Sequence, residues 1–204
     1  MIGDTVIAIE GLSAFRSLEE IPEKILRAAA RAVNRTTERT RTAAGREIRK
    51  QVNLPARYVN DNLFTGGAAT PEKLEREIVG RFRATSLARY ASGTPESTRK
   101  AGGVRLTIAP GAARFMKRAF LVRLRGTGGD TGANANIGLA IRLKPGETIR
   151  NKKVSLTITK SGLALLYGPS IDQLFTTVRD DVSPEASDFL EREFLRLVEL
   201  DLPK

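Results

Sequence analysis

Apolar and small residues recur every three or four positions through the first quarter of the chain, as they do on one face of a helix. They are Ile21, Ile25, Ala28, Ala29, Ala32, Val33, Thr36, Ala43, Ala44, Ile48 and Val52. Ser17-Leu18-Glu19-Glu20 has the form of a capping box, and Pro22 falls in the first turn, where its missing N–H has no intrahelical partner. The pattern predicts a helix over 18–52, roughly 50 Å long, which must bend or project from its domain.

Asn53-Leu54-Pro55 ends this pattern, and a short second helix is expected over about 55–63. Beyond Gly66-Gly67 the period changes from 3.6 to two. Apolar residues alternate with charged or polar ones over 74–82, 104–108, 120–124, 137–141 and 154–158. Strands with one wet face pair readily in an antiparallel sheet, so we expect a sheet of about five strands, with a further short strand over 5–9.

Ser183-Pro184-Glu185 is typical of a helix start, because it offers a capping hydroxyl, a proline at the first position and an acid at the positive end of the dipole. The apolar stripe that follows is Ala186, Phe189, Leu190, Phe194, Leu197 and Val198. This amphipathic helix should pack on one face of the sheet. The sequence therefore predicts an α+β fold with a long N-terminal helix, in a single domain over 1–204.

A glycine-rich stretch, GTGGDTGANAN over 126–136, lies between two predicted strands. Its composition indicates a flexible hairpin loop that becomes ordered against a neighbouring subunit. A phosphate-binding P-loop is not expected, because that motif ends in Gly-Lys-Ser/Thr before a helix.

Composition excludes much chemistry, because the chain contains no His and no Cys. It therefore lacks the usual zinc, copper and haem ligands, a thiolate nucleophile and a side chain that titrates near neutrality. We expect no enzyme activity, catalytic residue, metal, cofactor or small-molecule substrate. A carboxylate site built from Asp172 with Asp180 or Asp181 is the enzymatic alternative. No early run is apolar and long enough for a signal peptide or membrane span, so we expect a soluble protein made in a cytoplasm.

The net charge of +11 is unevenly distributed. Residues 1–170 carry 30 basic and 14 acidic residues, a net +16, whereas residues 171–204 carry 4 and 9, a net −5. Opposite charges at two places can steer copies of one protein into head-to-tail contact. A basic surface also suits nucleic acid, and the simplest reading is a well-solvated surface.

Four arginines, Arg27, Arg31, Arg35 and Arg39, recur at four-residue intervals on the long helix. Such a stripe is either the wet face of an amphipathic helix or a surface for an acidic partner. Only Glu38 and Glu47 lie within the central stretch, so few intrahelical ion pairs are expected. The four arginines are therefore candidates to face DNA or a protein partner.

Several stretches resemble the prophage minor tail protein Z family of lambda-like siphophages, over roughly residues 20 to 200. They are Ala32-Val33-Asn34-Arg35-Thr36, Arg46-Glu47-Ile48-Arg49, VNLPARYV over 52–59, RFRATSLARY over 81–90 and LYGPSIDQLF over 166–175. The resemblance implies a structural tail-completion protein of the virion, made in the bacterial host cytoplasm. Such a protein acts at the head-proximal end of the tail, the neck, with the tail terminator, before heads and tails join.

The expected partners follow from that role and from the charges. They are further copies of the chain in a closed ring, the tail terminator, tail tube or neck proteins, and genomic DNA in the lumen; no membrane is expected. Glu191 and Glu193 in the acidic segment are candidates for contacts between subunits. The alternative function is sequence-independent nucleic-acid binding by the protein on its own. Against it, the sequence has no helix-turn-helix signature and no platform of aromatic and basic residues.

Overall fold

The computed structural model describes residues 5–6, 22–124, 136–144, 147, 154–159 and 162–201. The chain divides into two compact units. The helical unit comprises Met1–Ile48, Ala56–Arg81 and Asp172–Lys204, and the β-rich unit comprises Arg49–Pro55 and Phe82–Ile171. Each unit is described by itself below, and a single domain over 1–204 stays a prediction.

The long N-terminal helix α1 runs from Glu23 to Gln51, so its end lies one residue before the predicted one. Just before it, the carbonyl of Pro22 accepts hydrogen bonds from the N–H groups of Ile25 and Leu26, at 2.9 and 3.3 Å. Pro22 therefore opens the first turn from outside the helix, where proline costs no hydrogen bond. The predicted capping box and most of the predicted strand over 5–9 lie outside the described residues.

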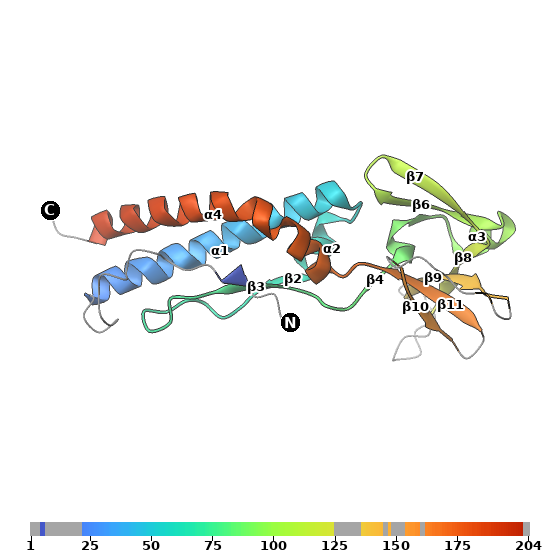
Figure 1. Cartoon of the computed structure of the whole chain (residues 1–204), viewed down its shortest axis with the longest axis horizontal. Helices are drawn as coiled ribbons and strands as arrows, with labels where there is room; N and C mark the ends of the chain where they lie inside the picture. Colours follow the sequence, from blue (N-terminus) through green and yellow to red (C-terminus); the bar gives the residue numbers. More distant parts are fainter. Residues whose placement is uncertain are drawn as a thin grey trace. The chain divides into compact units, whose positions relative to one another are not determined.

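The C-terminal helix α4 (Ile171–Asp201) begins twelve residues before the predicted start at Ser183, and that prediction was wrong. Five buried side chains explain the earlier start, because their spacing of three or four places them on one helix face: Ile171, Leu174, Phe175, Val178 and Val182. Pro184 lies inside α4. Proline removes one helical hydrogen bond and favours a kink, and α4 bends along its length in Figure 1.

Helices α1 and α4 pack side by side in the helical unit, as Figure 1 shows in blue and red. Their common core joins Ala28, Ala32 and Val33 of α1 to Leu190 and Leu197 of α4. The alanines have short side chains, so the larger side chains of α4 come close to the backbone of α1. The apolar stripe predicted for the C-terminal helix is confirmed, but it packs on α1, where the sequence predicted a sheet.

The opposite side of α1 meets a small antiparallel sheet, ordered β1-β3-β2. Its strands are β1 (Thr5–Val6), β2 (Leu63–Thr65) and β3 (Glu77–Gly80). The short helix α2 (Ala56–Asn60) precedes β2, close to the predicted position. Buried Gly45 of α1 lies so close to α2 that a Cβ added at this position would be 3.3 Å from Asn60 Oδ1. The long helix is thus covered on both sides.

The β-rich unit contains two antiparallel sheets. In one, β10 (Ser155–Ile158), β11 (Leu163–Gly168), β9 (Ile137–Arg142) and β8 (Ala119–Arg123) follow in that order, and β4 (Thr85–Ser86) also pairs with β11. In the other, β5 (Ala91–Ser92), β6 (Gly103–Ala109) and β7 (Ala112–Lys117) are neighbours in that order. The 3₁₀ helix η3 (Leu87–Tyr90) and helix α3 (Pro95–Lys100) complete the unit.

The predicted α+β class is confirmed, with its long N-terminal helix and antiparallel strands. The five predicted strands do not share one sheet, however: they correspond to β3, β6, β8, β9 and β10, which lie in three sheets. Apart from Asn136, the predicted flexible loop over 126–136 lies outside the described residues. At its base, Leu124 donates its N–H to the carbonyl of Asn136 at 2.7 Å, as expected for two strands joined in a hairpin.

Candidate functional site

The arginine stripe of α1 is largely occupied by contacts inside the helical unit. Arg35 pairs with Glu193 of α4, and Arg39 pairs with Glu185 of α4 at 2.8 Å. The guanidinium of Arg39 also lies 4.6 Å from the centre of the Phe189 ring, a cation–π distance. The carboxylates that are scarce along α1 are thus supplied by α4.

The other two arginines of the stripe are exposed. Arg27 pairs with Glu23, one turn earlier on the same helix. Exposed pairs of this kind contribute little to stability. The stripe therefore consists of two pairs. Arg35 and Arg39, the inner pair, contact α4, and Arg27 and Arg31, the outer pair, lie nearer the start of α1.

Glu193 is the most enclosed carboxylate of this contact, with 8% of its surface exposed. Arg196 donates two hydrogen bonds to it, at 2.7 and 2.9 Å, and Arg35 donates another. These bonds favour the charged form, so the Arg196 guanidinium first, and then Arg35, lowers the pKa of Glu193 to about 2. Glu193, a candidate for contact between subunits, thus already has its partners inside the chain.

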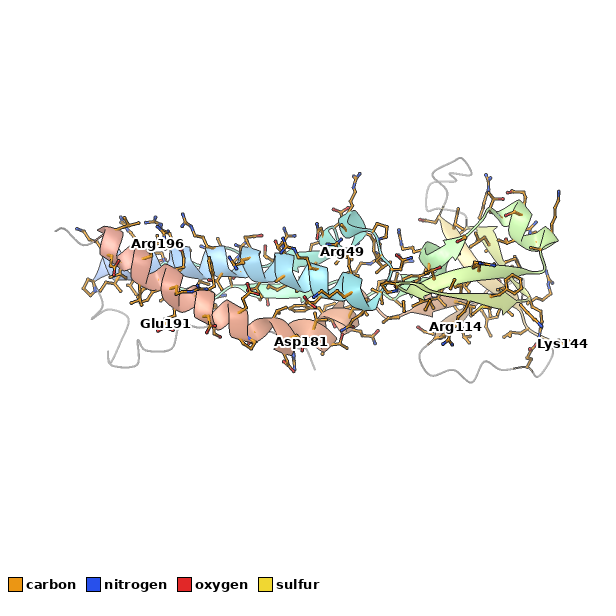
Figure 2. The ribbon with its side chains drawn as sticks, turned by 90° about the horizontal axis from the view of Figure 1, so that it is seen from above. Arg49, Arg114, Lys144, Asp181, Glu191 and Arg196 are labelled. Carbon is orange, nitrogen blue, oxygen red and sulfur yellow. The ribbon has the colours of Figure 1, made fainter. Side chains whose placement is uncertain are left out.

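Glu191, the other candidate, belongs to an exposed acidic stripe on α4. Its members are Asp181, Asp188, Glu191 and Glu199, with Leu195 among them. Positions at these spacings lie within one face of a helix, here the face opposite the buried Leu197. Their carboxylates make no ion pair within the part of the chain that the structure describes. Figure 2 shows Asp181 and Glu191 on α4.

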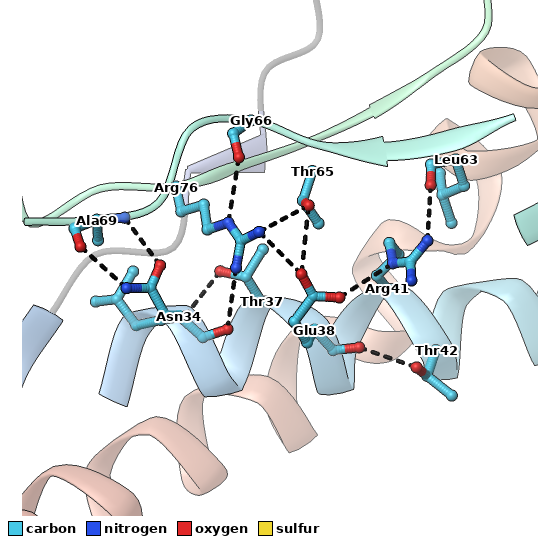
Figure 3. A network of polar contacts seen from close by, with 11 residues as sticks. Asn34, Thr37, Glu38, Arg41, Thr42, Leu63, Thr65, Gly66, Ala69 and Arg76 are labelled. Carbon is cyan, nitrogen blue, oxygen red and sulfur yellow. Dashed lines mark hydrogen bonds and ion pairs between the residues drawn. The ribbon is translucent and has the colours of Figure 1, made fainter. Parts of the chain in front are cut away.

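A polar network joins α1 to the connection between β2 and β3 (Figure 3). Its centre is Arg76, whose side chain is only 14% exposed. The guanidinium pairs with Glu38 at 2.9 Å and donates to the Thr65 hydroxyl at 2.8 Å and to the carbonyls of Gly66 and Asn34 at 3.3 and 3.4 Å. The sequence did not predict this network, because Arg76 stands 42 residues from Asn34 in an ordinary charged stretch.

Asn34 adds a second connection between the same two elements. Its side-chain amide donates to the carbonyl of Ala69 at 2.9 Å and accepts from the N–H of Ala69 at 2.8 Å. One amide thereby satisfies both backbone groups of a residue outside any strand. Asn34 is one of the residues that carried the family resemblance, and its contacts give it a structural role.

The charge of the chain is divided unequally between the two units. Within its ranges, the β-rich unit has 18 basic and 3 acidic residues, a net +15. The helical unit has 16 basic and 20 acidic residues, a net −4. The acidic segment 171–204 lies with the basic helix α1, so the two largely balance, and the positive excess of the chain is concentrated in the β-rich unit.

The described residues contain no cluster of three or more acids that would hold a metal ion. The three carboxylates considered for an enzyme site are not brought together either. Asp172 stands in the first turn of α4, and Asp180 follows eight residues later, about 12 Å along the axis. Asp180 pairs with the neighbouring Arg179 at 3.3 Å, and Asp181 is exposed. Among the described helices, none has the length and apolar character that crossing a membrane requires.

Comparison with known families explains this lack of catalytic geometry. No curated protein and no solved structure matches the chain. The family model described as prophage minor tail protein Z (GPZ) matches residues 9–124, which is more than half of the 204 residues. The matched part includes α1, the network around Arg76 and strands β2 to β8, and ends before the stretch 166–175. The chain therefore belongs to the prophage minor tail protein Z family, as a structural component of the phage tail and not an enzyme.

Proposed function

We propose that this protein is a tail-completion component that assembles in a ring at the head-proximal end of the tail, with the tail terminator and tube. Membership of a minor tail protein family supports a place in the tail. The observation that carries the proposal is the separation of charge between the helical unit at −4 and the β-rich unit at +15. Two different surfaces of opposite sign favour a head-to-tail contact between copies, and such contacts close into a ring when the rotation from one copy to the next allows it.

The acidic stripe of α4 is the surface that supplies the negative side of this contact. Its carboxylates have no ion-pair partner in the described part of the chain, whereas Glu185 and Glu193 are paired with α1. Exposed Leu195, at 53% exposure, lies within the stripe and gives it apolar area to bury. We therefore keep Glu191 as a candidate for contact between subunits. Glu193 has a different role, because its ion pair with Arg35 holds α4 on α1.

Charge reversal in the stripe tests this assembly. The double variant Asp188→Lys, Glu191→Lys should lose most ring particles in negative-stain images and in sedimentation, because like charges then face each other. The matched control Glu72→Lys, Glu75→Lys makes the same change in charge at two exposed sites before β3 and should assemble normally. Normal rings from the stripe variant would refute the proposed contact. Equal losses of ring particles in both variants would show that the effect comes from net charge alone.

The place in the tail requires a test in the phage. Without this protein, infected cells should accumulate filled heads and tails of normal length that do not join, and immunogold labelling of wild-type tails should mark the head-proximal end. Joined, infectious virions from the deletion would refute tail completion. Label at the opposite end of the tail would refute the neck position.

Sequence-independent nucleic-acid binding is the second candidate function. What favours it is the +15 excess of the β-rich unit, because an uncompensated positive surface attracts phosphate. The inner pair of the arginine stripe supports it less, since Arg35 and Arg39 already bind carboxylates of α4. The two candidates are compatible, because DNA passes through the lumen of a tail.

A further inference from the structure

Strands β6 and β7 carry three exposed cations, Arg105, Arg114 and Lys117. Within the described part of the chain, the side chains of these three residues make no hydrogen bond and no ion pair. Strand β7 is the edge of its sheet, and its residues are exposed except for the partly buried Met116. Figure 2 shows Arg114 among the side chains of the β-rich unit.

The strand register places Arg105 and Lys117 on one face, whereas Arg114 lies opposite Leu106 and points to the other side of the edge strand. Arg105 lies directly opposite Phe115, and Gly103 lies opposite Lys117. Because side chains alternate along a strand, Arg105, Phe115 and Lys117 all point to the same side. Arg105 and Lys117 are diagonal neighbours, roughly 7–8 Å apart at their backbones. Two like charges so placed repel each other unless an anion lies between them.

Phe115 stands between the two cations and is 53% exposed. A Cβ added to Gly103 would lie 2.4 Å from Phe115 Cζ, so the end of the aromatic ring rests on the bare backbone of the glycine. This support fixes an aromatic surface beside the two cations. The face therefore combines positive charge with an aromatic group, which the sequence did not reveal because Phe115 and Arg105 are ten residues apart.

The two described carboxylates of the unit, Glu96 and Glu147, pair with other arginines and not with this face. Glu96 pairs with Arg123 at 3.8 Å, and Glu147 accepts two hydrogen bonds from Arg118, at 2.7 and 2.9 Å. Arg118 also helps to lower the pKa of Glu147 to about 2, so this carboxylate stays charged and paired. The third acid of the unit, Asp130, lies outside the described residues. Within the described residues of this unit, the positive face therefore has no carboxylate partner.

We propose that the exposed face of β6 and β7, with the edge of β7, binds the phosphate backbone of DNA without reading its bases. A second copy of the chain does not provide enough negative charge. If every helical unit at −4 faced a β-rich unit at +15, each copy would keep a net +11. Duplex DNA carries one charge per ~1.7 Å of its axis and supplies that difference. That this DNA is the genome in the tail lumen rests on the proposed function; the binding itself does not.

The test measures binding of the full chain to a duplex of arbitrary sequence over a range of salt concentrations. The variant Arg105→Gln, Arg114→Gln, Lys117→Gln should bind at least about tenfold more weakly near 0.1 M salt, because each lost phosphate contact also loses its counterion release. The slope of log K against log salt should fall by about 2 to 3, at ~0.9 for each contact. Two duplexes of different sequence should give the same values.

The matched control is Lys24→Gln, Arg46→Gln, Arg57→Gln, which removes the same charge from exposed positions of α1 and α2 outside the arginine stripe. It should bind within about twofold of the unchanged protein. Equal losses in the two triple variants, or an unchanged salt slope in the β6–β7 variant, would overturn the proposal. If circular dichroism shows that the triple variant fails to fold, the single changes Arg114→Gln and Lys117→Gln on the edge strand carry the same test, at a slope change of ~0.9 each.

Particle assembly distinguishes this inference from the proposed function. If the β6–β7 variant binds DNA normally but forms no rings, the face meets another copy, and the DNA proposal is wrong. If it loses DNA binding while heads and tails still join, the DNA proposal holds independently. If wild-type chain binds DNA but virions assemble without the protein, tail completion fails while the DNA contact stands.

Discussion

The two units use arginine in opposite ways. In the helical unit, Arg35, Arg39 and Arg76 each bind a carboxylate from a distant part of the chain. In the β-rich unit, Arg105 and Arg114 have no such partner among the described residues. A count of basic residues along the sequence gives both units the same character. The helical unit thus uses these arginines to hold itself together, whereas Arg105 and Arg114 stay exposed, and we propose that they meet an outside anion.

The largest effect should come from removing the packing of α4 on α1, because this packing brings the carboxylates of α4 to the arginines of α1. Leu197→Ala should cost about 3 kcal/mol of unfolding free energy, because Leu197 is fully buried against α1. Leu195→Ala, on the exposed face of the same helix, should cost less than about 0.5 kcal/mol. Urea denaturation followed by far-ultraviolet circular dichroism measures both. Equal costs would mean that α4 is not held on α1 by this face.

An arginine from each unit gives a sharper comparison. Arg76→Met should destabilise by roughly 2.5 kcal/mol, because it removes the ion pair with Glu38 and the hydrogen bonds to the carbonyls of Gly66 and Asn34 from a largely buried site. Arg105→Met should change the unfolding free energy by less than about 0.5 kcal/mol, since its side chain is exposed and unpaired in the described structure. The same denaturation measurement applies. A costly Arg105→Met change would show that the β-rich unit also depends on its arginines for stability.

The pH dependence of Glu193 is the smallest of the three effects. Its folded pKa of about 2 lies below the ordinary 4.5, so the stabilisation is fully present above pH ~4.5 and is lost as pH falls toward ~2. At pH 7, Glu193→Gln should cost about 2 kcal/mol, the value of its charge-assisted hydrogen bonds. The difference from the unchanged protein should shrink between pH 4.5 and 2. A constant difference over that range would show that Glu193 packs but does not act through its charge.

Periodicity identified the elements that have one buried and one wet face. The alternation of Val104, Leu106 and Ile108 with polar residues predicted β6, and the spacing of small residues predicted α1 to within one residue of its end. The two longest strands that the sequence did not predict, β7 and β11, have no such contrast. In β11, Ala164, Leu165 and Leu166 are all buried, whereas β7 is exposed along almost its whole length. A strand with like faces carries no period of two.

The candidate site was only partly predictable, for a different physical reason. Helical spacing correctly placed Arg35 and Arg39 on one side of α1. Their partners lie 158 and 146 residues away, and no local pattern links residues at that separation. The start of α4 was missed because Pro184 was interpreted as a first helical residue, although the apolar spacing from Ile171 to Val182 already favoured a helix.

The order of the segments along the chain has a consequence for synthesis on the ribosome. The β-rich unit is enclosed between parts of the helical unit, since it ends at Ile171 and α4 follows. All of the β-rich unit is therefore translated before α4 emerges from the ribosome. Until then, α4 does not cover the alanine face of α1. The helical unit is thus begun first and completed last, and α4 can pack on α1 only after the whole β-rich unit has been translated.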